Sequence, residues 1–477
     1  MNFDLKKRYC YYFNEISKIP HGSRNEKALS NYICQFAKDH HLSYKQDHVY
    51  NVLIDKPASA GYENSEPVIL QAHIDMVCEK NDDSDHDFEK DPLDLYVEDG
   101  WLTARGTTLG ADDGSGAAYM LAILEDDSLP HPPLECIFTT MEEIGLLGAA
   151  ELSAEDLHGH RYISLDGNGV SVTETSCAGA VSVRIMQPIT RVSCSLPLYQ
   201  LRVKGLIGGH SGGMIDKERG NANIIAARIL KEAILQDAHI TLTSLKGGLK
   251  ENAIPRESSF CFVSDTPQET LERIIQASIQ AIKQELQFSD PDVAITLQNS
   301  GTADSCFEQS LSDRLIDFIY LMPHGLLHKS MAIEGLTTSS LNLGVIYEQD
   351  DTVTYEIFVR AADDSCRNDT CNKLHVLADL LHLEHVIPEG YPGWAYSPDS
   401  DLRRIMKEVV ERHGFEYREI ATHGGLECGI VKGLDPQMDI ITFGPISEAI
   451  HSPDERLELQ SFDDGYEILC EILKECK

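Results

Sequence analysis

The sequence predicts an α/β protein in which a mostly parallel mixed sheet, flanked by helices, is interrupted by an inserted α+β domain. Three observations support this fold class. Apolar runs near both chain ends alternate with helical patterns, as in sheets built from crossover connections. The middle of the chain instead shows strands that alternate apolar and polar side chains. A chain of 477 residues is also long for a single hydrophobic core.

Both ends of the chain carry elements expected of the parallel sheet. Because short apolar runs bounded by turn residues are typical of buried strands, we expect strands at 68–72, 134–138, 162–165 and 438–443. Helical periodicity predicts helices at 117–125 and 462–474. The two ends are therefore expected to form one discontinuous domain, residues 1–186 and 388–477.

The middle of the chain is expected to form a separate domain over residues 187–387. Helical periodicity covers 221–235 and 268–286, and half-buried strands are predicted at 241–243 and 354–358. Long helices mixed with alternating strands favour an α+β layer with helices on one face of the sheet.

The composition limits the kind of partner. With 40 basic and 77 acidic residues the formal charge is −37, which disfavours nucleic acid and anionic membrane surfaces as partners. The 13 cysteines include no Cys-x-x-Cys pair, so we expect mainly reduced thiols. No stretch is long and apolar enough to span a bilayer, and the N-terminus carries no secretory pattern, which predicts a cytoplasmic protein.

Histidine and acidic residues stand where the predicted strands and one turn end. His73 follows the first strand, with Asp75 two residues later, and Asp112 lies in a glycine-rich turn that opens a helix. Taken singly, His73 and Asp75 also suit a strand end followed by a turn, and Asp112 suits a helix cap. The alternative interpretation is that His73 and Asp112 are metal ligands at the edge of the sheet where ligands bind, and that Asp75 accepts the other N–H of His73.

The paired glutamates Glu142 and Glu143 favour the metal interpretation. Adjacent carboxylates at the end of an apolar strand repel each other unless a cation or a raised pKa relieves the charge. Asp166 follows the strand 162–165, and His451 lies in a loop after the last apolar strand. Two histidines and several carboxylates are typical of a site for two divalent ions, most simply zinc, with cobalt or manganese also suitable. The sequence thus predicts a metal-dependent hydrolase.

At this point the chain resembles a known family, the zinc peptidases related to aminoacylase and glutamate carboxypeptidase. The resemblance rests on the ordered motifs His73-Ile74-Asp75, Gly110-Ala111-Asp112, Met141-Glu142-Glu143-Ile144-Gly145 and His451-Ser452-Pro453-Asp454-Glu455. It implies that His73, Asp112 and Asp166 hold one zinc, and that Asp112, Glu143 and His451 hold the other. It further implies that Asp75 orients His73 and that Glu142 is the general base.

The resemblance also implies roles for residues of the inserted domain. His210 would stabilise the developing oxyanion, and Asn252, Arg360 and Gly425 would receive the C-terminal end of the substrate. By residue type alone, His210 and Asn252 also suit flexible turns, and Arg360 a surface salt bridge. The implied activity is hydrolysis of unblocked dipeptides, including histidine-containing ones such as carnosine, by a homodimer formed through the inserted lid domain.

Two other functions remain open from the sequence. A deacylase of N-acyl amino acids would use the same metals and base, and a non-catalytic relative would bind peptides without cleaving them. The chain also departs from the usual family pattern at Asp113, Met214, Ala361 and Gly167. These departures bear on metal affinity and substrate preference.

Overall fold

The computed structural model describes residues 3–477, and the chain divides into two units. Unit 1 comprises Met1–Cys177, Trp394–Ala421 and Leu426–Lys477, and unit 2 comprises Ala178–Gly393 and Thr422–Gly425. The first boundary falls nine residues before the 186/187 boundary expected from the sequence, because β9 (Gly179–Pro188) pairs along its whole length with β18 (Thr352–Ala361) of unit 2. The second falls six residues after the expected 387/388 boundary.

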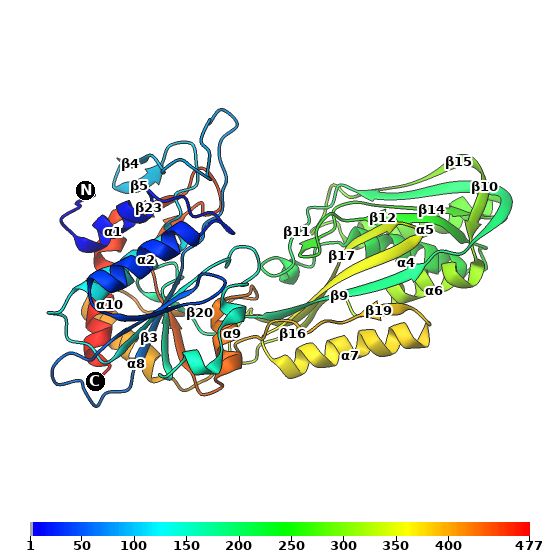
Figure 1. Ribbon diagram of the computed structural model, residues 1–477. Helices are drawn as coiled ribbons and strands as arrows, with labels where there is room; N and C mark the ends of the chain where they lie inside the picture. The colour runs from blue at the N-terminus through cyan, green and yellow to red at the C-terminus, as the bar shows by residue number, and fades with distance from the viewer. Residues whose placement is uncertain (1–2) are drawn as a thin grey trace. The chain divides into compact units, whose positions relative to one another are not determined.

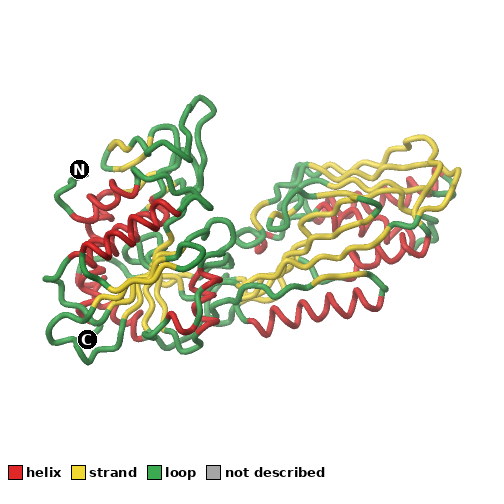
Figure 2. Tube along the Cα trace, in the orientation of Figure 1, coloured by secondary structure: helices red, strands yellow, loops and turns green. Residues whose placement is uncertain are grey.

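The centre of unit 1 is a six-stranded mixed sheet (Figures 1 and 2). Its strands, in spatial order, are β1 (Ser43–Gln46), β2 (Val52–Lys56), β6 (Leu134–Thr139), β3 (Val68–His73), β7 (Arg161–Ser164) and β21 (Asp439–Thr442). The neighbours β6, β3, β7 and β21 are parallel to one another. At one edge of the sheet, β2 is antiparallel to β6 and β1 is antiparallel to β2. Every residue of β3 and β6 is buried, as expected of strands covered on both faces.

Six helices belong to unit 1. They are α1 (Arg8–Ile16), α2 (Lys27–Asp39), α3 (Ala111–Glu125), α8 (Asp401–Arg412), α9 (Glu427–Leu434) and α10 (Leu459–Glu475), with the short 3-10 turns η1 (Ala149–Glu151) and η2 (Ala154–Asp156). The central helix α3 is buried along nearly its whole length, and its apolar residues join those of α1, α10 and β3 in one core. Burial on all sides explains why α3 carries almost no polar face.

Two small sheets complete unit 1. One pairs β8 (Val172–Glu174) with β20 (Arg418–Ile420) in parallel. The other contains β4 (Leu95–Glu98), β5 (Trp101–Ala104), β23 (Arg456–Glu458) and β22 (Ser447–Glu448). Pairing of β23 with β5 holds the chain segment that follows His451 against the first half of the sequence.

Unit 2 is built on one large antiparallel sheet (Figure 1). In spatial order its strands are β15 (Ala294–Phe307), β10 (Arg191–Lys204), β14 (Ser258–Val263), β12 (Thr241–Gly247), β17 (Thr337–Gln349), β18, β9 and β19 (Glu384–Val386), with β16 (Gly325–Lys329) also paired to β17. A separate short ribbon joins β11 (Gly209–His210) to β13 (Ala253–Ile254).

Four helices accompany this sheet, together with the 3-10 turn η3 (Ile215–Lys217). They are α4 (Ala222–Ile234), α5 (Gln268–Glu285), α6 (Gln309–Leu321) and α7 (Asp364–Leu380). Apolar residues of all four helices join residues of the strands in a single core that is distinct from the core of unit 1. In Figure 1, α7 runs beside β9 and β19 at one edge of the sheet.

Two further observations concern the whole described chain. Among residues 3–477, no helix combines the length and the apolar character needed to cross a membrane. All 13 cysteines are free thiols, and most of them are buried.

Candidate metal centre

The three parallel strands β3, β6 and β7 bring polar residues to one edge of the unit 1 sheet. His73 is the last residue of β3 and pairs with Thr139, the last residue of β6. Asp166 lies two residues beyond Ser164, where β7 ends. Since carboxyl ends of neighbouring parallel strands meet at one edge, this arrangement follows directly from the strand order β6-β3-β7.

His73 points its two ring nitrogens at different partners. Nδ1 lies 3.0 Å from the backbone oxygen of Asp75 and 3.5 Å from its Oδ1. Nε2 lies 3.0 Å from Asp112 Oδ1 and 4.0 Å from Asp166 Oδ1. Burial lowers the pKa of His73, but the Asp112 and Asp75 carboxylates outweigh it and raise the pKa well above its ordinary value. With Nδ1 held by Asp75, Nε2 is the nitrogen available to a cation.

The role of Asp75 extends beyond His73. Its side chain is buried, with Oδ1 accepting from the backbone N–H of Glu142 at 2.9 Å. Oδ2 accepts from Ser23 Oγ at 2.7 Å and from the N–H of Glu143 at 3.3 Å. One carboxylate therefore fixes both the histidine at the end of β3 and the turn that carries the two glutamates.

The turn after β6 bends enough to bring both glutamates to the same region. Met141 and Gly145 have positive φ values of 53° and 116°, so the chain leaves the extended conformation around Glu142 and Glu143. Ligand atoms of His73, Glu142 and Glu143 all lie within 4.8 Å of one another. Burial raises the pKa of Glu142 to about 8, and the carboxylates of Glu427, Glu143 and Asp112 add to this shift.

Asp112 is shared between two overlapping groups of possible ligands. His73, Asp112 and Asp166 form one group, and Asp112, Glu143 and His451 form the other, each within 4.8 Å. His451 Nε2 lies 2.8 Å from Glu143 Oε1 and 3.4 Å from Asp112 Oδ2. The Asp112 and Glu143 carboxylates raise the pKa of His451 to about 10. The two groups have the donor types that suit two divalent ions with one bridging carboxylate.

Asp166 supports the same interpretation through its charge. Burial raises the pKa of Asp166 well above its ordinary value, and the nearby Asp112 and Glu142 carboxylates raise it further. Four carboxylates thus share this region with two imidazoles. Such a cluster is unfavourable as a set of ions unless positive charge neutralises it, so its residues fit a pair of cations.

Sequence reasoning did not assign a role to Glu455, which holds the glycine-rich turn before Asp112. Its buried carboxylate accepts from the N–H groups of Leu109 and Gly110 through Oε2, at 2.7 and 3.0 Å. Oε1 accepts from Ala111 at 2.9 Å and from Asp112 at 3.4 Å. Because Glu455 is four residues after His451, it connects two ligand-bearing loops. Its presence in the His451–Glu455 motif was the only available signal.

A second buried network lies beneath His73. Glu427 Oε2 accepts hydrogen bonds from Gln71 Nε2 at 2.5 Å and Thr139 Oγ1 at 2.7 Å, and Ser164 Oγ donates to Gln71 Oε1 at 2.9 Å. Burial raises the pKa of Glu427 to about 7. The network ties β3, β6 and β7 to the start of α9. Glu427 lies two residues after Gly425, but nothing in the sequence indicated its partners.

The four residues that depart from the family pattern lie in different environments. Asp113 belongs to neither ligand group; burial raises its pKa well above the ordinary value, and its Oδ1 accepts from the N–H of Gly116. A Cβ at Gly167 would lie 2.7 Å from the backbone nitrogen of Phe443, which explains why this backbone excludes an acidic side chain. Met214 is exposed and Ala361 is buried.

Unit 2 contains a polar cluster of the opposite charge. Arg360 is only 4% exposed, and its Nε and Nη1 are buried without hydrogen-bond partners. Its Nη2 lies 3.3 Å from His210 Nε2. His210 Nδ1 accepts from the N–H groups of Gly212 and Gly213, both at 3.3 Å, while Nε2 faces a second donor, Arg360 Nη2. The imidazole and the guanidinium therefore lie side by side.

The other two predicted substrate residues lie in the same unit. His210 pairs with Ala253, the neighbour of Asn252, through the ribbon of β11 and β13. Gly425 approaches Tyr391 so closely that a Cβ would lie 2.7 Å from the phenol oxygen. Sequence reasoning missed His423, whose Nε2 lies 2.7 Å from Ser340 Oγ and whose Nδ1 is buried without a partner.

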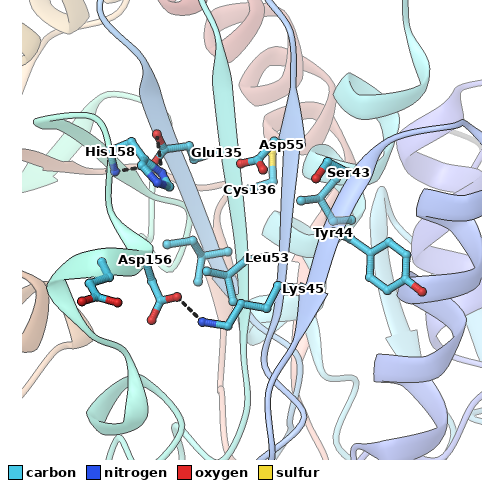
Figure 3. Close-up of a pocket in the computed structure, with 12 residues that line it drawn as sticks. Ser43, Tyr44, Lys45, Leu53, Asp55, Glu135, Cys136, Asp156 and His158 are labelled. Carbon is cyan, nitrogen blue, oxygen red and sulfur yellow. Dashed lines mark hydrogen bonds and ion pairs between the residues drawn. The ribbon is translucent and has the colours of Figure 1, made fainter.

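A cavity of about 250 Å³ in unit 1 is lined by a different set of residues (Figure 3). Residues of β1, β2 and β6 line it together with the loop 155–158. Lys45 pairs there with Asp156, and His158 donates its backbone N–H to Glu135 at 2.9 Å. None of the residues expected to bind metal or substrate lines this cavity, so it is distinct from the metal-ligand cluster.

Comparisons with known proteins show the family and fold of the chain. Residues 69–475 match the model of the peptidase family M20/M25/M40. The chain is 35% identical to the cytosol non-specific dipeptidase of Escherichia coli over 97% of this chain and 96% of that protein. The crystal structure of aminoacylhistidine dipeptidase from Vibrio alginolyticus has a TM-score of 0.90 and 34% identity, covering 98% of this chain and 96% of that one. Aminopeptidase PepT from Bacillus cereus shares the fold, with a TM-score of 0.57, 15% identity and full coverage of both chains.

Proposed function

The chain belongs to the peptidase family M20/M25/M40, and on that premise we propose how its residues hydrolyse dipeptides. It is a hydrolase of peptide bonds whose substrates are dipeptides, as the names of its two full-length relatives indicate. The observation that supports a metal-dependent mechanism best is the sharing of Asp112 by two groups of ligand atoms. We propose zinc as the metal in both positions, because imidazole and carboxylate ligands together suit it.

In the proposed reaction, His73, Asp112 and Asp166 would hold one ion, and Asp112, Glu143 and His451 would hold the other. Two divalent ions held there would lower the pKa of the attacking water and polarise the scissile carbonyl. Glu142 would accept a proton from the attacking water and later donate it to the leaving amine. The position of Glu142 supports this role, because one of its carboxylate oxygens lies within 4.8 Å of ligand atoms of His73 and Glu143.

Asp75 acts as a positioning residue in this mechanism. It accepts hydrogen bonds from the backbone of Glu142 and Glu143 and lies against His73 Nδ1. Through these contacts it holds the base Glu142 and one proposed ligand of each ion, His73 and Glu143, in a fixed relation. Fixed geometry of this kind is what makes an intramolecular proton transfer fast.

We further propose that unit 2 supplies the groups that recognise the free carboxylate of the substrate. The unpartnered Nε and Nη1 of Arg360 support this role, because a buried guanidinium with free N–H groups suits a planar carboxylate. His210 would stabilise negative charge on the scissile carbonyl oxygen, and Asn252 and Gly425 would complete the recognition. Recognition of the free carboxylate end would limit substrates to short peptides, with Xaa-His dipeptides among them.

The remaining proposals concern assembly and location. We propose a homodimer formed through unit 2, supported by β15, a 14-residue strand that ends the large sheet and so offers backbone groups along one side. A cytoplasmic location is supported by the name of the Escherichia coli relative.

The base assignment is tested by Glu142→Gln. This variant keeps the shape of the side chain but cannot accept the proton, so we expect kcat for an unblocked dipeptide to fall by about 100- to 10,000-fold. The metal content, measured by elemental analysis, should stay equal to that of the wild type. Glu151→Gln, an exposed glutamate of unit 1, serves as the matched control and should leave kcat unchanged. A Glu142→Gln enzyme that retains most of its kcat would refute the mechanism.

A further inference from the structure

A second group of metal-ligand side chains lies in unit 2, at the end of α7. His375 and Asp379 are four residues apart on this helix, so they occupy the same face one turn apart. After α7 ends at Leu380 the chain reverses direction through His382, which has a φ of 53°. The reversal leads into β19 and returns His385 to the side of the helix.

The three side chains converge. One ligand atom from each of His375, Asp379 and His385 lies within 4.8 Å of those of the other two. His375 Nδ1 and His385 Nε2 are 2.7 Å apart. The Asp379 carboxylate lies on the other side of both rings, with Oδ2 3.6 Å from His375 Nε2 and Oδ1 4.0 Å from His385 Nδ1.

This geometry is close to that of an ion site. Two nitrogen ligands of a tetrahedral zinc ion are separated by about 3.3 Å when each bond is about 2.0–2.1 Å long. The carboxylate faces His375 Nε2 and His385 Nδ1 rather than the two nitrogens that are hydrogen-bonded, so a cation bound by all three residues would lie on the carboxylate's side of the rings. Side-chain rotations would bring ligand atoms that already lie within 4.8 Å of one another to bonding positions. Rotations of the exposed His375 side chain can supply this movement, because 52% of it is open to solvent.

The backbone that carries the three ligands is well anchored. Leu374 and Ala378, the residues before His375 and Asp379, are fully buried in the core of unit 2, and Leu383 is 4% exposed. The N–H of Leu383 donates to the backbone oxygen of Ala378 at 2.9 Å, which closes the turn. His385 pairs with Ile185 of β9. The ligands therefore project from fixed positions, which lowers the entropic cost of binding an ion.

We propose that His375, Asp379 and His385 form a third cation site, independent of the catalytic centre, that takes a divalent transition metal such as zinc. Two imidazoles and one carboxylate favour zinc, nickel or copper over magnesium or calcium. Because the side chains of His375 and Asp379 are 52% and 60% exposed, water completes the coordination. The acidic chain, with a formal charge of −37, raises the local concentration of cations.

The ion would join β19 to α7. The strand β19 is an end strand of the large sheet and pairs with β9 over only three residues. A metal ion shared by the strand and the helix adds a connection that does not depend on this short pairing. The site therefore acts as a structural clip at one edge of unit 2.

Zinc titration of the metal-loaded enzyme tests the proposal. We expect elemental analysis and native mass spectrometry to find a third zinc per chain, and calorimetry with zinc alone to detect one further binding event. His375→Ala should weaken that event by more than about 100-fold, since even the loss of a hydrogen-bond partner of a metal-bound histidine costs about 10- to 100-fold. Alanine suits the exposed helical position of His375, so the fold should persist.

His385→Ala should have the same effect as His375→Ala, while dipeptidase activity stays unchanged in both. The matched control is His239→Ala, which removes an exposed histidine of unit 2 that faces a single carboxylate, Asp265, at 3.0 Å. This control should retain the third ion. A stoichiometry of two ions in the wild type, or a third ion retained in both His375→Ala and His385→Ala, would overturn the proposal. Neither result would bear on the role of Glu142, which is read from kcat.

Discussion

The two polar clusters of this protein, one in each unit, have opposite charge and indicate opposite ligands. In unit 1, the carboxylates of Asp112, Glu142, Glu143 and Asp166 outnumber two imidazoles, and burial raises the pKa of Asp166 and Glu142. In unit 2, a buried arginine lies beside a histidine, and two of its nitrogens lack partners. The excess negative charge of the first cluster favours cations as ligands, and the excess positive charge of the second favours an anion.

The comparison shows that unpaired buried charge indicates the charge of the ligand that a cluster binds. A structural ion pair neutralises itself, as Lys45 and Asp156 do in the separate cavity of unit 1. A functional cluster leaves one sign in excess, and the ligand supplies the other. The sign of the excess charge therefore distinguishes the acidic cluster of unit 1 from the Arg360 cluster of unit 2. It supports the proposal that the first binds metal ions and the second a carboxylate, without reference to family or fold.

The largest effect is expected from Asp112→Asn. The amide removes the negative charge and one of the two equivalent oxygens that face His73 and His451, at 3.0 and 3.4 Å. Both groups of ligands lose their shared member, so we expect the variant to lose bound metal. The fall in kcat/KM should exceed the loss of about 100- to 10,000-fold that is expected when a general base is removed. Elemental analysis and steady-state kinetics measure the two effects.

The neighbouring residue provides the control. Asp113→Asn replaces a buried side chain that belongs to neither ligand group, and the amide oxygen can keep the hydrogen bond that Oδ1 accepts from the N–H of Gly116. Metal content and kcat/KM should therefore stay close to those of the wild type. If Asp113→Asn loses as much metal as Asp112→Asn, the charge of the whole turn matters and the assignment of Asp112 as the bridge is wrong.

A smaller effect is expected from Arg360→Ala in unit 2. A hydrogen bond to a charged group contributes about 1.5–3 kcal/mol, so KM for free dipeptides should rise by about 10- to 100-fold. For the same dipeptides with an amidated C-terminus the rise should be much smaller, because no carboxylate is present. Arg202→Ala, an exposed arginine of β10 paired with Glu257, is the matched control. Equal losses on free and amidated substrates would exclude the carboxylate role.

Much of the unit 1 site could be predicted because its residues follow local patterns. His73 and Asp166 stand at the ends of apolar strands, and Asp112 stands at the start of a helix. The local sequence pattern therefore predicts the place of each residue without knowledge of its spatial neighbours. The parallel order of β6, β3 and β7 then brings them to one edge. The predicted strands at 68–72 and 134–138 correspond to β3 and β6, each with one further residue at its end.

The residues that hold the ligands could not be predicted in this way. Glu455 is 343 positions from Asp112, whose N–H it accepts, and Glu427 is 356 positions from Gln71. Such contacts depend on the final packing of the chain and leave no periodic signal. The same is true of His423, since the segment Thr422–Gly425 belongs to unit 2 although both of its neighbours along the chain belong to unit 1.

The site at the end of α7 was missed for a related reason. His375 and Asp379 have the spacing of a helical face, but a histidine and an aspartate four residues apart are common on exposed helices. The third member, His385, joins them only because the chain reverses after α7 and β19 pairs with β9. The reversal depends on residues 381–383, where His382 adopts a positive φ and no glycine marks the turn in the sequence.

The smallest effect concerns the pH dependence of stability through His423. Burial lowers the pKa of His423 to about 3, and the positive charge of Arg360 and the neighbouring His210 lower it further, against the opposing effect of Asp216. The unfolded chain has the ordinary histidine pKa of about 6.5 and so binds more protons below that pH. Stability conferred by neutral His423 is therefore full above pH 6.5 and declines as the pH falls towards 3. From pH 6.5 to 5.5 the expected loss is about 1 kcal/mol.

His423→Gln isolates this contribution. Glutamine does not titrate, and its amide can replace the contact of His423 Nε2 with Ser340 Oγ. Urea unfolding at pH 6.5 and 5.5 would give the difference between wild type and variant at each pH, in which the other titrating groups cancel. The wild type should lose about 1 kcal/mol more than the variant over this interval. An equal loss in both would mean that His423 is protonated in the folded protein, and the cluster of unit 2 would then carry an additional positive charge beside Arg360.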